Sequence, residues 1–134
     1  MIKEEEETLF YTIQAVINGV IEDKKENPKN KKLLEDIEGQ INIGLHVEED
    51  FILWINLVMK KGTFITKKGK LEEYDLELIA DPEDLMYFLN GTYSTLHMLL
   101  KKNRFGNRKL QFNKGTSGSN FGLLLKLPKI LVLD

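Results

Sequence analysis

The segment "QINIGLHVEEDFILWINLV" (residues 40–58) indicates two β-strands joined by a tight turn. In residues 40–47 apolar and more polar residues alternate, and a second strand-like run, 51–58, follows after only three acidic residues. A period of two residues is typical of a strand with one buried face, and so short a polar break favours a β-hairpin.

Placing Val47 opposite Phe51 fixes a register in which both strands present the same apolar face. In this register Trp54 lies across the bare Gly44 on the opposite, outer face. Because Ile52, Trp54 and Val58 share that outer face, it is only partly polar, and we expect a partner subunit or the chain's own tail to cover some of it. The predicted pairs are Ile41–Leu57, Ile43–Ile55 and Leu45–Leu53 on the apolar face, and Asn42–Asn56, Gly44–Trp54 and His46–Ile52 on the outer face.

Two helices are predicted before the hairpin and two short strands after it. Apolar residues at helical spacing predict a helix over residues 3–25 with an acidic first turn, and Asn27, Pro28 and Gly39 delimit a short helix over 27–39. Lysine-flanked, edge-like strands are predicted over 62–69 and 74–80.

The segment "DPEDLMYFLNG" (81–91) predicts a well-delimited helix, which Asp81 caps at its start and Gly91 ends in a left-handed conformation. A second helix, capped by Thr92, is predicted over 92–102.

The chain ends with a predicted strand over 108–115, a glycine-rich lead-in with Ser119 as a helix cap, and an apolar segment that Pro128 interrupts. Strands in one block with helices at both sides predict an α+β fold, one domain over residues 1–134 with the helices on one face of the sheet.

The composition excludes several classes of protein. Nineteen Lys and Arg residues against 21 Asp and Glu residues leave a net charge of −2, which provides no basic surface excess of the kind that nucleic-acid binders carry. The chain has no cysteine, no signal-peptide pattern, and no apolar run near the length of about 18 residues that spans a bilayer. We expect a cytoplasmic protein.

Residues suited to catalysis or metal binding are few. His46 and His97 lie far apart in the sequence and form no metal-ligand motif. Four carboxylates are candidates for acid–base chemistry, but each has a simpler structural explanation as a strand-edge, capping or first-turn residue. No nucleophile, phosphate-loop or dinucleotide motif occurs, so we expect no catalytic residue, metal or cofactor. The four carboxylates are Asp75, Glu77, Asp81 and Glu83.

The later helices carry more apolar residues than a single buried face needs. Leu85, Phe88 and Leu89 recur at helical spacing, but Met86 and Tyr87 widen the stripe. Such helices either fill a core or form the walls of a cavity, and periodicity leaves both interpretations open.

The order of these segments resembles the sterol carrier protein type-2 family. The resemblance rests on "DLELIADPEDLMYFLNGTYSTLHMLL" (75–100), preceded by "GTFITKKGKLEEY" and followed by "RKLQFNKGTSG" and a leucine-rich tail. The chain departs from the family pattern in its basic segment "KKNRFGNRKLQF" and in the proline of its closing segment. The matching signature positions are Asp81, Pro82, Asp84, Leu85, Leu89, Gly91, Lys109, Leu110 and Gly115.

The resemblance implies a five-stranded, twisted, mostly antiparallel sheet with helices on one face and an apolar tunnel between them. The implied ligands are fatty acids, fatty acyl-CoA, sterols or other isoprenoid-like lipids, bound without catalysis or metal, and transient membrane contact is compatible with that role. Segment 115–122 and Pro128 are the expected hinge of a lid over the tunnel. The expected tunnel lining is Ile13, Ile17, Phe88, Leu89, Leu96, Leu99, Leu123, Leu124 and Leu127.

The alternative is a protein-interaction or dimerisation module that serves as an accessory to an enzyme. In that case the core would be filled, and Ile52 and Trp54 on the outer sheet face would contact a second copy of the chain.

Overall fold

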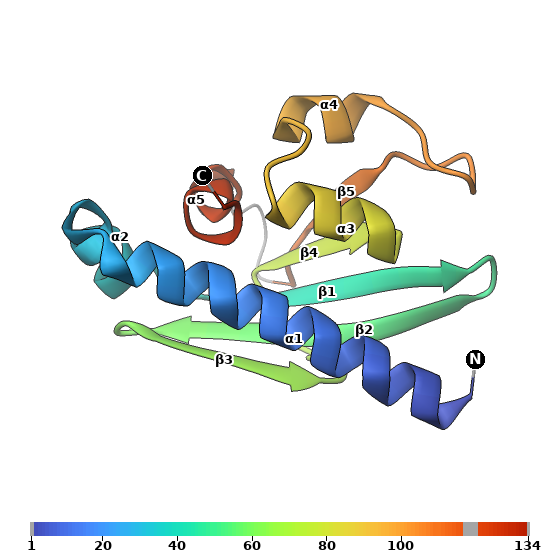
Figure 1. The fold of residues 1–134 in the computed structure, drawn as a ribbon, viewed down its shortest axis with the longest axis horizontal. Coiled ribbons are helices and arrows are strands. Elements are labelled where there is room, and N and C mark those ends of the chain that lie inside the picture. Colours follow the sequence, from blue (N-terminus) through green and yellow to red (C-terminus); the bar gives the residue numbers. More distant parts are fainter. Residues whose placement is uncertain (1, 117–120, 134) are drawn as a thin grey trace.

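A computed structural model describes residues 2–116 and 121–133, which form one sheet with helices on one of its faces (Figure 1). The strand order is β3-β2-β1-β4-β5, and only the β1–β4 pair is parallel. The predicted α+β architecture is therefore confirmed. The elements are α1 (Lys3–Glu26), the 3-10 turn η1 (Pro28–Asn30), α2 (Lys31–Asp36), β1 (Gly39–Glu48), β2 (Phe51–Lys60), β3 (Thr63–Lys68), β4 (Leu76–Ala80), α3 (Pro82–Leu89), α4 (Thr95–Leu100), β5 (Leu110–Lys114) and α5 (Phe121–Leu131).

The β1–β2 hairpin has the predicted register over most of its length. All six predicted pairs from Ile41–Leu57 to His46–Ile52 form, and a Cβ atom on Gly44 would lie 2.9 Å from the Trp54 ring, so Trp54 covers this glycine as expected. The predicted Val47–Phe51 pair is wrong. The register shifts between His46 and Glu48, so that Glu48 faces Phe51. A bulge of this kind adds one unpaired residue beside the turn.

The prediction that 74–80 forms an edge-like strand is also wrong. β4 lies inside the sheet, parallel to β1 on one side and antiparallel to β5 on the other, with Leu76, Glu77 and Leu78 buried. Because β3 and β4 both run parallel to β1, a tight turn cannot join them. Residues 69–75 therefore cross over the β1–β2 hairpin, from the β3 edge of the sheet to the far side of β1.

This crossover is held on the outer sheet face by two buried asparagines that face each other on β1 and β2. Asn42 accepts a hydrogen bond from the Leu71 backbone N–H (2.8 Å) and donates one to the Leu71 carbonyl (3.0 Å), and Asn56 donates to the Gly69 carbonyl (2.9 Å). Buried amides need such partners, which explains two polar residues in the middle of the sheet. The crossover, rather than the tail, provides the expected cover.

The α3 helix begins and ends as predicted. The Asp81 side chain accepts a hydrogen bond from the Glu83 N–H (2.9 Å), Pro82 occupies the first turn, and Gly91 has φ +74°. A Cβ atom on Gly91 would lie 2.7 Å from the Leu133 carbonyl oxygen, so the close approach of the chain end also requires glycine.

Two predictions for the later helices are corrected. The N-cap of α4 is Ser94, whose hydroxyl accepts from the His97 N–H (3.1 Å), whereas the Thr92 N–H donates to Asn90 before the helix starts. The α5 helix continues through Pro128 to Leu131 instead of breaking there. Proline has no N–H, so the Leu124 carbonyl one turn earlier loses its helical partner. The predicted Ser119 cap lies outside the described residues.

The first helix agrees with the sequence, whereas the segment predicted as one short helix over 27–39 forms the 3-10 turn η1 followed by α2. α1 carries its acidic first turn, and Asn27 caps the following turn by accepting from the Lys29 N–H (3.1 Å). The short helix ends at Asp36 and not at the predicted Gly39, which already belongs to β1.

Candidate functional site

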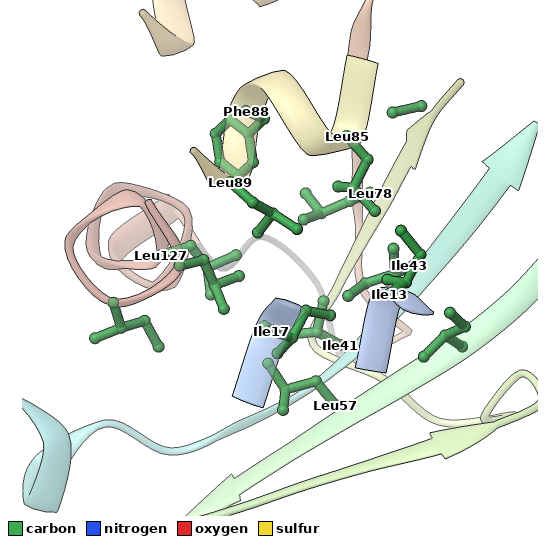
Figure 2. Packing of buried hydrophobic residues seen from close by; sticks show 14 of the residues in the cluster. Ile13, Ile17, Ile41, Ile43, Leu57, Leu78, Leu85, Phe88, Leu89 and Leu127 are labelled. Atoms are coloured by element: carbon green, nitrogen blue, oxygen red, sulfur yellow. The ribbon is translucent and has the colours of Figure 1, made fainter. Parts of the chain in front are cut away.

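The interior between the sheet and helices α1, α3 and α5 is built from hydrocarbon side chains (Figure 2). The inner sheet face contributes residues such as Ile41, Ile43 and Leu57, each at most 2% exposed. Figure 2 shows the helical side chains gathered over these strand residues. Five predicted lining residues meet here, each at most 1% exposed: Ile13, Ile17, Phe88, Leu89 and Leu127.

Two further predicted residues lie at the margin of this interior. Leu123 and Leu124, in the first turn of α5, are half-buried and pack against the same cluster. A Cβ atom on Gly39 would approach a Leu123 methyl group to 2.8 Å, so Leu123 sits directly on the start of β1. These residues join the interior to the surface.

The predicted residues of α4 do not gather with the rest. Leu99 is half-buried, but Leu96 is 66% exposed, and Met98 is the α4 residue that is fully buried in the core. Successive helical residues are about 100° apart, so Leu96 and Leu100 share one side of the helix while Met98 faces away from them. Spacing alone could not fix this rotation, because four of the six α4 residues are apolar.

On helices α3 and α5, three apolar core residues were missing from the predicted lining. Leu85 precedes Phe88 and Leu89 by three and four residues, and Ile130 and Leu131 follow Leu127 at the same spacings. That spacing is the sequence signal that identifies one helical face, and it could have found all three.

A cleft of about 720 Å³ opens beside Leu123, at the start of β1 and the end of β2. Its wall is mixed: Val58 and Tyr74 provide apolar surface, and the Asp75 carboxylate accepts a hydrogen bond from the Gln40 N–H (2.7 Å). It is therefore a place where the predicted lining meets solvent. The complete wall is Glu38, Gly39, Gln40, Val58, Met59, Lys60, Glu73, Tyr74, Asp75, Thr116 and Leu123.

A second cleft, of about 540 Å³, lies between the end of α1, α2 and the β2–β3 turn. It is lined by Lys25, Lys31, Lys61 and Leu34, among others, and by none of the predicted lining residues. We therefore assign it no part in the candidate site.

The carboxylates considered for catalysis have structural partners. Asp81 caps α3 and also binds Arg104 (2.7 Å), while Glu77 binds Lys70 (3.2 Å) and accepts from the Asn113 amide (2.7 Å). Asp75 binds the Gln40 N–H at the start of β1. The capping role of Asp81 is the one that the sequence suggested, whereas the strand-edge role expected for Glu77 is wrong, because Glu77 is buried on the inner strand β4.

Glu83 accepts a hydrogen bond from the Tyr87 hydroxyl one turn later (2.7 Å). This bond, together with the charge of Glu83, raises the pKa of Tyr87 above its ordinary value. Both effects favour the neutral phenol, so Tyr87 keeps its proton further into alkaline solution than a free tyrosine.

The two histidines belong to separate aromatic contacts. His46 stacks on Phe105 with ring centroids 4.2 Å apart, and His97 stacks on Tyr93 at 4.6 Å. Within residues 2–116 and 121–133, no group of three or more His, Asp and Glu side chains could hold a metal ion.

The outer sheet face is partly occupied by the crossover. Lys70 lies over the Trp54 ring, with its Nζ 4.3 Å from the centroid, and Trp54 and Ile52 are half-buried. The surface proposed for self-association is thus smaller than the sequence suggested.

Replacing Trp54 with alanine is expected to leave the oligomeric state unchanged and to lower the free energy of unfolding by about 1–2 kcal/mol. The reason is that Trp54 packs on Gly44 and Lys70 of its own chain. Size-exclusion chromatography with light scattering, combined with urea denaturation, measures both quantities. A dimer that dissociates on this substitution would instead support the interaction module.

Comparison with known proteins gives a match in fold. No protein-family model and no curated protein sequence matches the chain. The sterol carrier protein domain 2 of Helicoverpa armigera superposes with a TM-score of 0.63 at 16% identity, over 86% of this chain and 81% of that chain. A sterol carrier protein 2 crystal structure gives 0.58 at 16% identity, over 87% and 91%, and the sterol carrier protein 2 like 2 of Aedes aegypti gives 0.52 at 13%, over 88% and 98%.

Proposed function

We propose that this chain, which has the sterol carrier protein 2 fold, binds an apolar lipid between its sheet and helices α1, α3 and α5 and transfers it without catalysis. The lipid would be a fatty acid, a fatty acyl-CoA or a sterol or isoprenoid-like molecule. The observation that carries the proposal is the hydrocarbon interior, which reaches the surface at Leu123 in the cleft beside β1. The solved proteins of similar fold are named sterol carriers, which supports the same function.

The expected driving force is burial of the alkyl chain. Each methylene removed from water contributes about 0.8 kcal/mol, so a long acyl chain binds with few polar contacts. The mixed wall of the cleft, where Gln40, Lys60 and Thr116 accompany Leu123, would then hold the polar end of the lipid.

Access to the interior requires part of the helical cover to move. The core cluster is closely packed: its members Ile17, Phe88 and Leu127 are each at most 1% exposed. An alkyl chain that enters the interior must therefore displace some of the contacts in this cluster. α5 is the part of the cover best suited to move, because Pro128 removes one of its internal hydrogen bonds. We therefore propose that α5 is the lid expected from the sequence. Residues 117–120 of the predicted hinge lie outside the described part of the chain.

Replacing Leu123 with asparagine is expected to weaken fatty-acid binding about tenfold, because an apolar contact at the mouth of the interior is lost. The half-buried position makes the substitution compatible with folding. Displacement of a fluorescent fatty acid measures the affinity, and circular dichroism verifies the fold.

The matched control is the same substitution two residues later. Leu125 is on the same helix but 58% exposed, so Leu125→Asn should bind fatty acid like the unmodified protein. Native mass spectrometry of protein purified from cells, compared with the denatured mass, then identifies the non-covalent lipid. If no lipid accompanies the protein and added long-chain fatty acids do not bind, the proposed function is wrong.

A further inference from the structure

Charge is distributed very unevenly along this nearly neutral chain. Residues 85–133 contain eight lysine and arginine residues and no aspartate or glutamate, whereas residues 1–84 contain 20 of the 21 acidic residues. The described part of the cation-rich half forms most of α3 and all of α4, β5 and α5, which lie on one side of the molecule (yellow to red in Figure 1). The cations of this half therefore gather on one side of the fold.

The same side presents exposed apolar residues on α4. Leu96 is 66% exposed and Leu100 is 57% exposed, and because they are four residues apart they share one side of the helix. Tyr93, 39% exposed, stacks on His97 just before them. Figure 1 shows α4 at the rim of the molecule, away from α1.

Exposed cations follow these leucines directly. Lys101 and Lys102 come next in the chain, and Arg108 donates a hydrogen bond to the Leu100 carbonyl while a β-bridge joins Lys102 to Arg108. All three cationic residues are exposed. The backbone bridge and the Arg108 bond thus place these cationic residues beside the exposed leucines.

Two further cations anchor the segment that carries this cluster. Arg104 binds the buried carboxylate of Asp81 (2.7 Å) and the Val47 carbonyl (2.8 Å), and Lys109 binds the buried Asp84 (3.1 Å). Because these ion pairs neutralise Arg104 and Lys109, the charge offered to a partner comes mainly from Lys101, Lys102 and Arg108.

We propose that Tyr93, Leu96, Leu100, Lys101, Lys102 and Arg108 form a docking surface for an anionic lipid bilayer, called here the α4 surface. Exposed leucines beside lysine and arginine are the combination by which a surface helix binds an anionic membrane: apolar side chains enter the acyl boundary and cations meet the head groups. An amphipathic tyrosine suits the level between them. Nucleic acid would use the cations but not the leucines, and six residues offer little area for a stable protein interface.

Membrane docking adds a partner to the proposed lipid-binding function. The biological role of the α4 surface rests on that function. Met98 lies on the other side of the same short helix and is fully buried in the hydrocarbon interior. A membrane that binds Leu96 and Leu100 therefore contacts a helix that also covers the interior, so docking places the lipid site next to the bilayer.

Co-sedimentation of the full chain with vesicles tests the proposal. Vesicles of phosphatidylcholine with about 30% phosphatidylserine are expected to bind the protein, and vesicles of phosphatidylcholine alone to bind it at least tenfold more weakly. The double variants Leu96→Gln/Leu100→Gln and Lys101→Glu/Lys102→Glu should each reduce binding to anionic vesicles about tenfold or more. Glutamine retains helix propensity, so α4 should persist in the first variant.

Matched controls lie elsewhere on the fold. Ile65→Gln removes an exposed apolar residue of β3, and Lys31→Glu/Lys32→Glu makes the same charge change at an exposed lysine pair of α2. Both controls should bind anionic vesicles within about twofold of the unmodified protein.

The proposal is overturned if the unmodified protein does not sediment with anionic vesicles, or if the α4 variants and the controls lose binding equally. Fatty-acid binding in the absence of vesicles is measured on the same variants and should not change. Fatty-acid binding without vesicle binding would refute the α4 proposal and leave the proposed function standing. Vesicle binding without fatty-acid binding would refute the proposed function and leave the α4 proposal standing.

Discussion

Replacing Phe88 with alanine is expected to lower the free energy of unfolding by about 3–5 kcal/mol. Phe88 lies on α3 with 1% of its surface exposed and belongs to the cluster between helices and sheet (Figure 2). Alanine would remove the ring and leave a cavity, because a close-packed interior relaxes only in part. Urea denaturation followed by circular dichroism measures the difference.

The matched control for Phe88 is Leu96, another apolar helical residue that the sequence placed in the same lining. Because Leu96 is largely exposed on α4, Leu96→Ala should change stability by no more than about 0.5 kcal/mol. Comparable losses in the two variants would show that Leu96 is buried like Phe88 and that α4 is rotated about its axis.

Replacing Gly115 with alanine is expected to destabilise the protein by about 3 kcal/mol or more. A Cβ atom on Gly115 would lie 2.3 Å from the Tyr74 carbonyl oxygen and 2.4 Å from the carbonyl carbon of Asp75. These are backbone atoms, which no side-chain rotation can move, so the segments before β4 and after β5 would have to separate. Thermal or urea denaturation measures the loss.

The control for Gly115 is a glycine whose substitution should have the opposite effect. Gly19 lies in the middle of α1, and a Cβ atom there meets nothing within 4 Å. Alanine has the higher helix propensity, so Gly19→Ala should stabilise the protein by about 0.5–1 kcal/mol. A near-neutral Gly115→Ala variant would contradict the close approach of the two segments.

The hairpin register could be predicted from sequence because one misplaced residue would turn every apolar side chain of a strand to the wrong face. The bulge before Glu48 could not, since it changes only the last pair beside the turn. The position of β4 was also inaccessible, because parallel pairing of Leu76 with Ile41 joins residues far apart in the chain. Its apolar residues are compatible with either an edge or an inner strand.

The candidate site was predictable where helices are long or strongly delimited. Ile13 and Ile17 on α1 and Phe88 and Leu89 on α3 all reach the interior, as their spacing indicated. The six residues of α4 give too short a pattern to define a buried side, and the sequence placed Leu96 inside instead of Met98. Whether a lipid tunnel forms in this interior stays a prediction, because hydrocarbon side chains can equally pack against each other or against an alkyl chain.

The crossover over the outer sheet face also links the sheet's one parallel pair to the register of the hairpin. Strands β1, β2 and β3 follow one another through short turns and pair with their neighbours in the chain, whereas β4 pairs with β1 across the crossover of residues 69–75. Asn42 and Asn56 hold that passage only when they face outward together. A hairpin that slipped by one residue would turn one asparagine inward and leave the crossover without one of its two supports. The position of β4 in the sheet is therefore tied to the register of the hairpin through these two side chains.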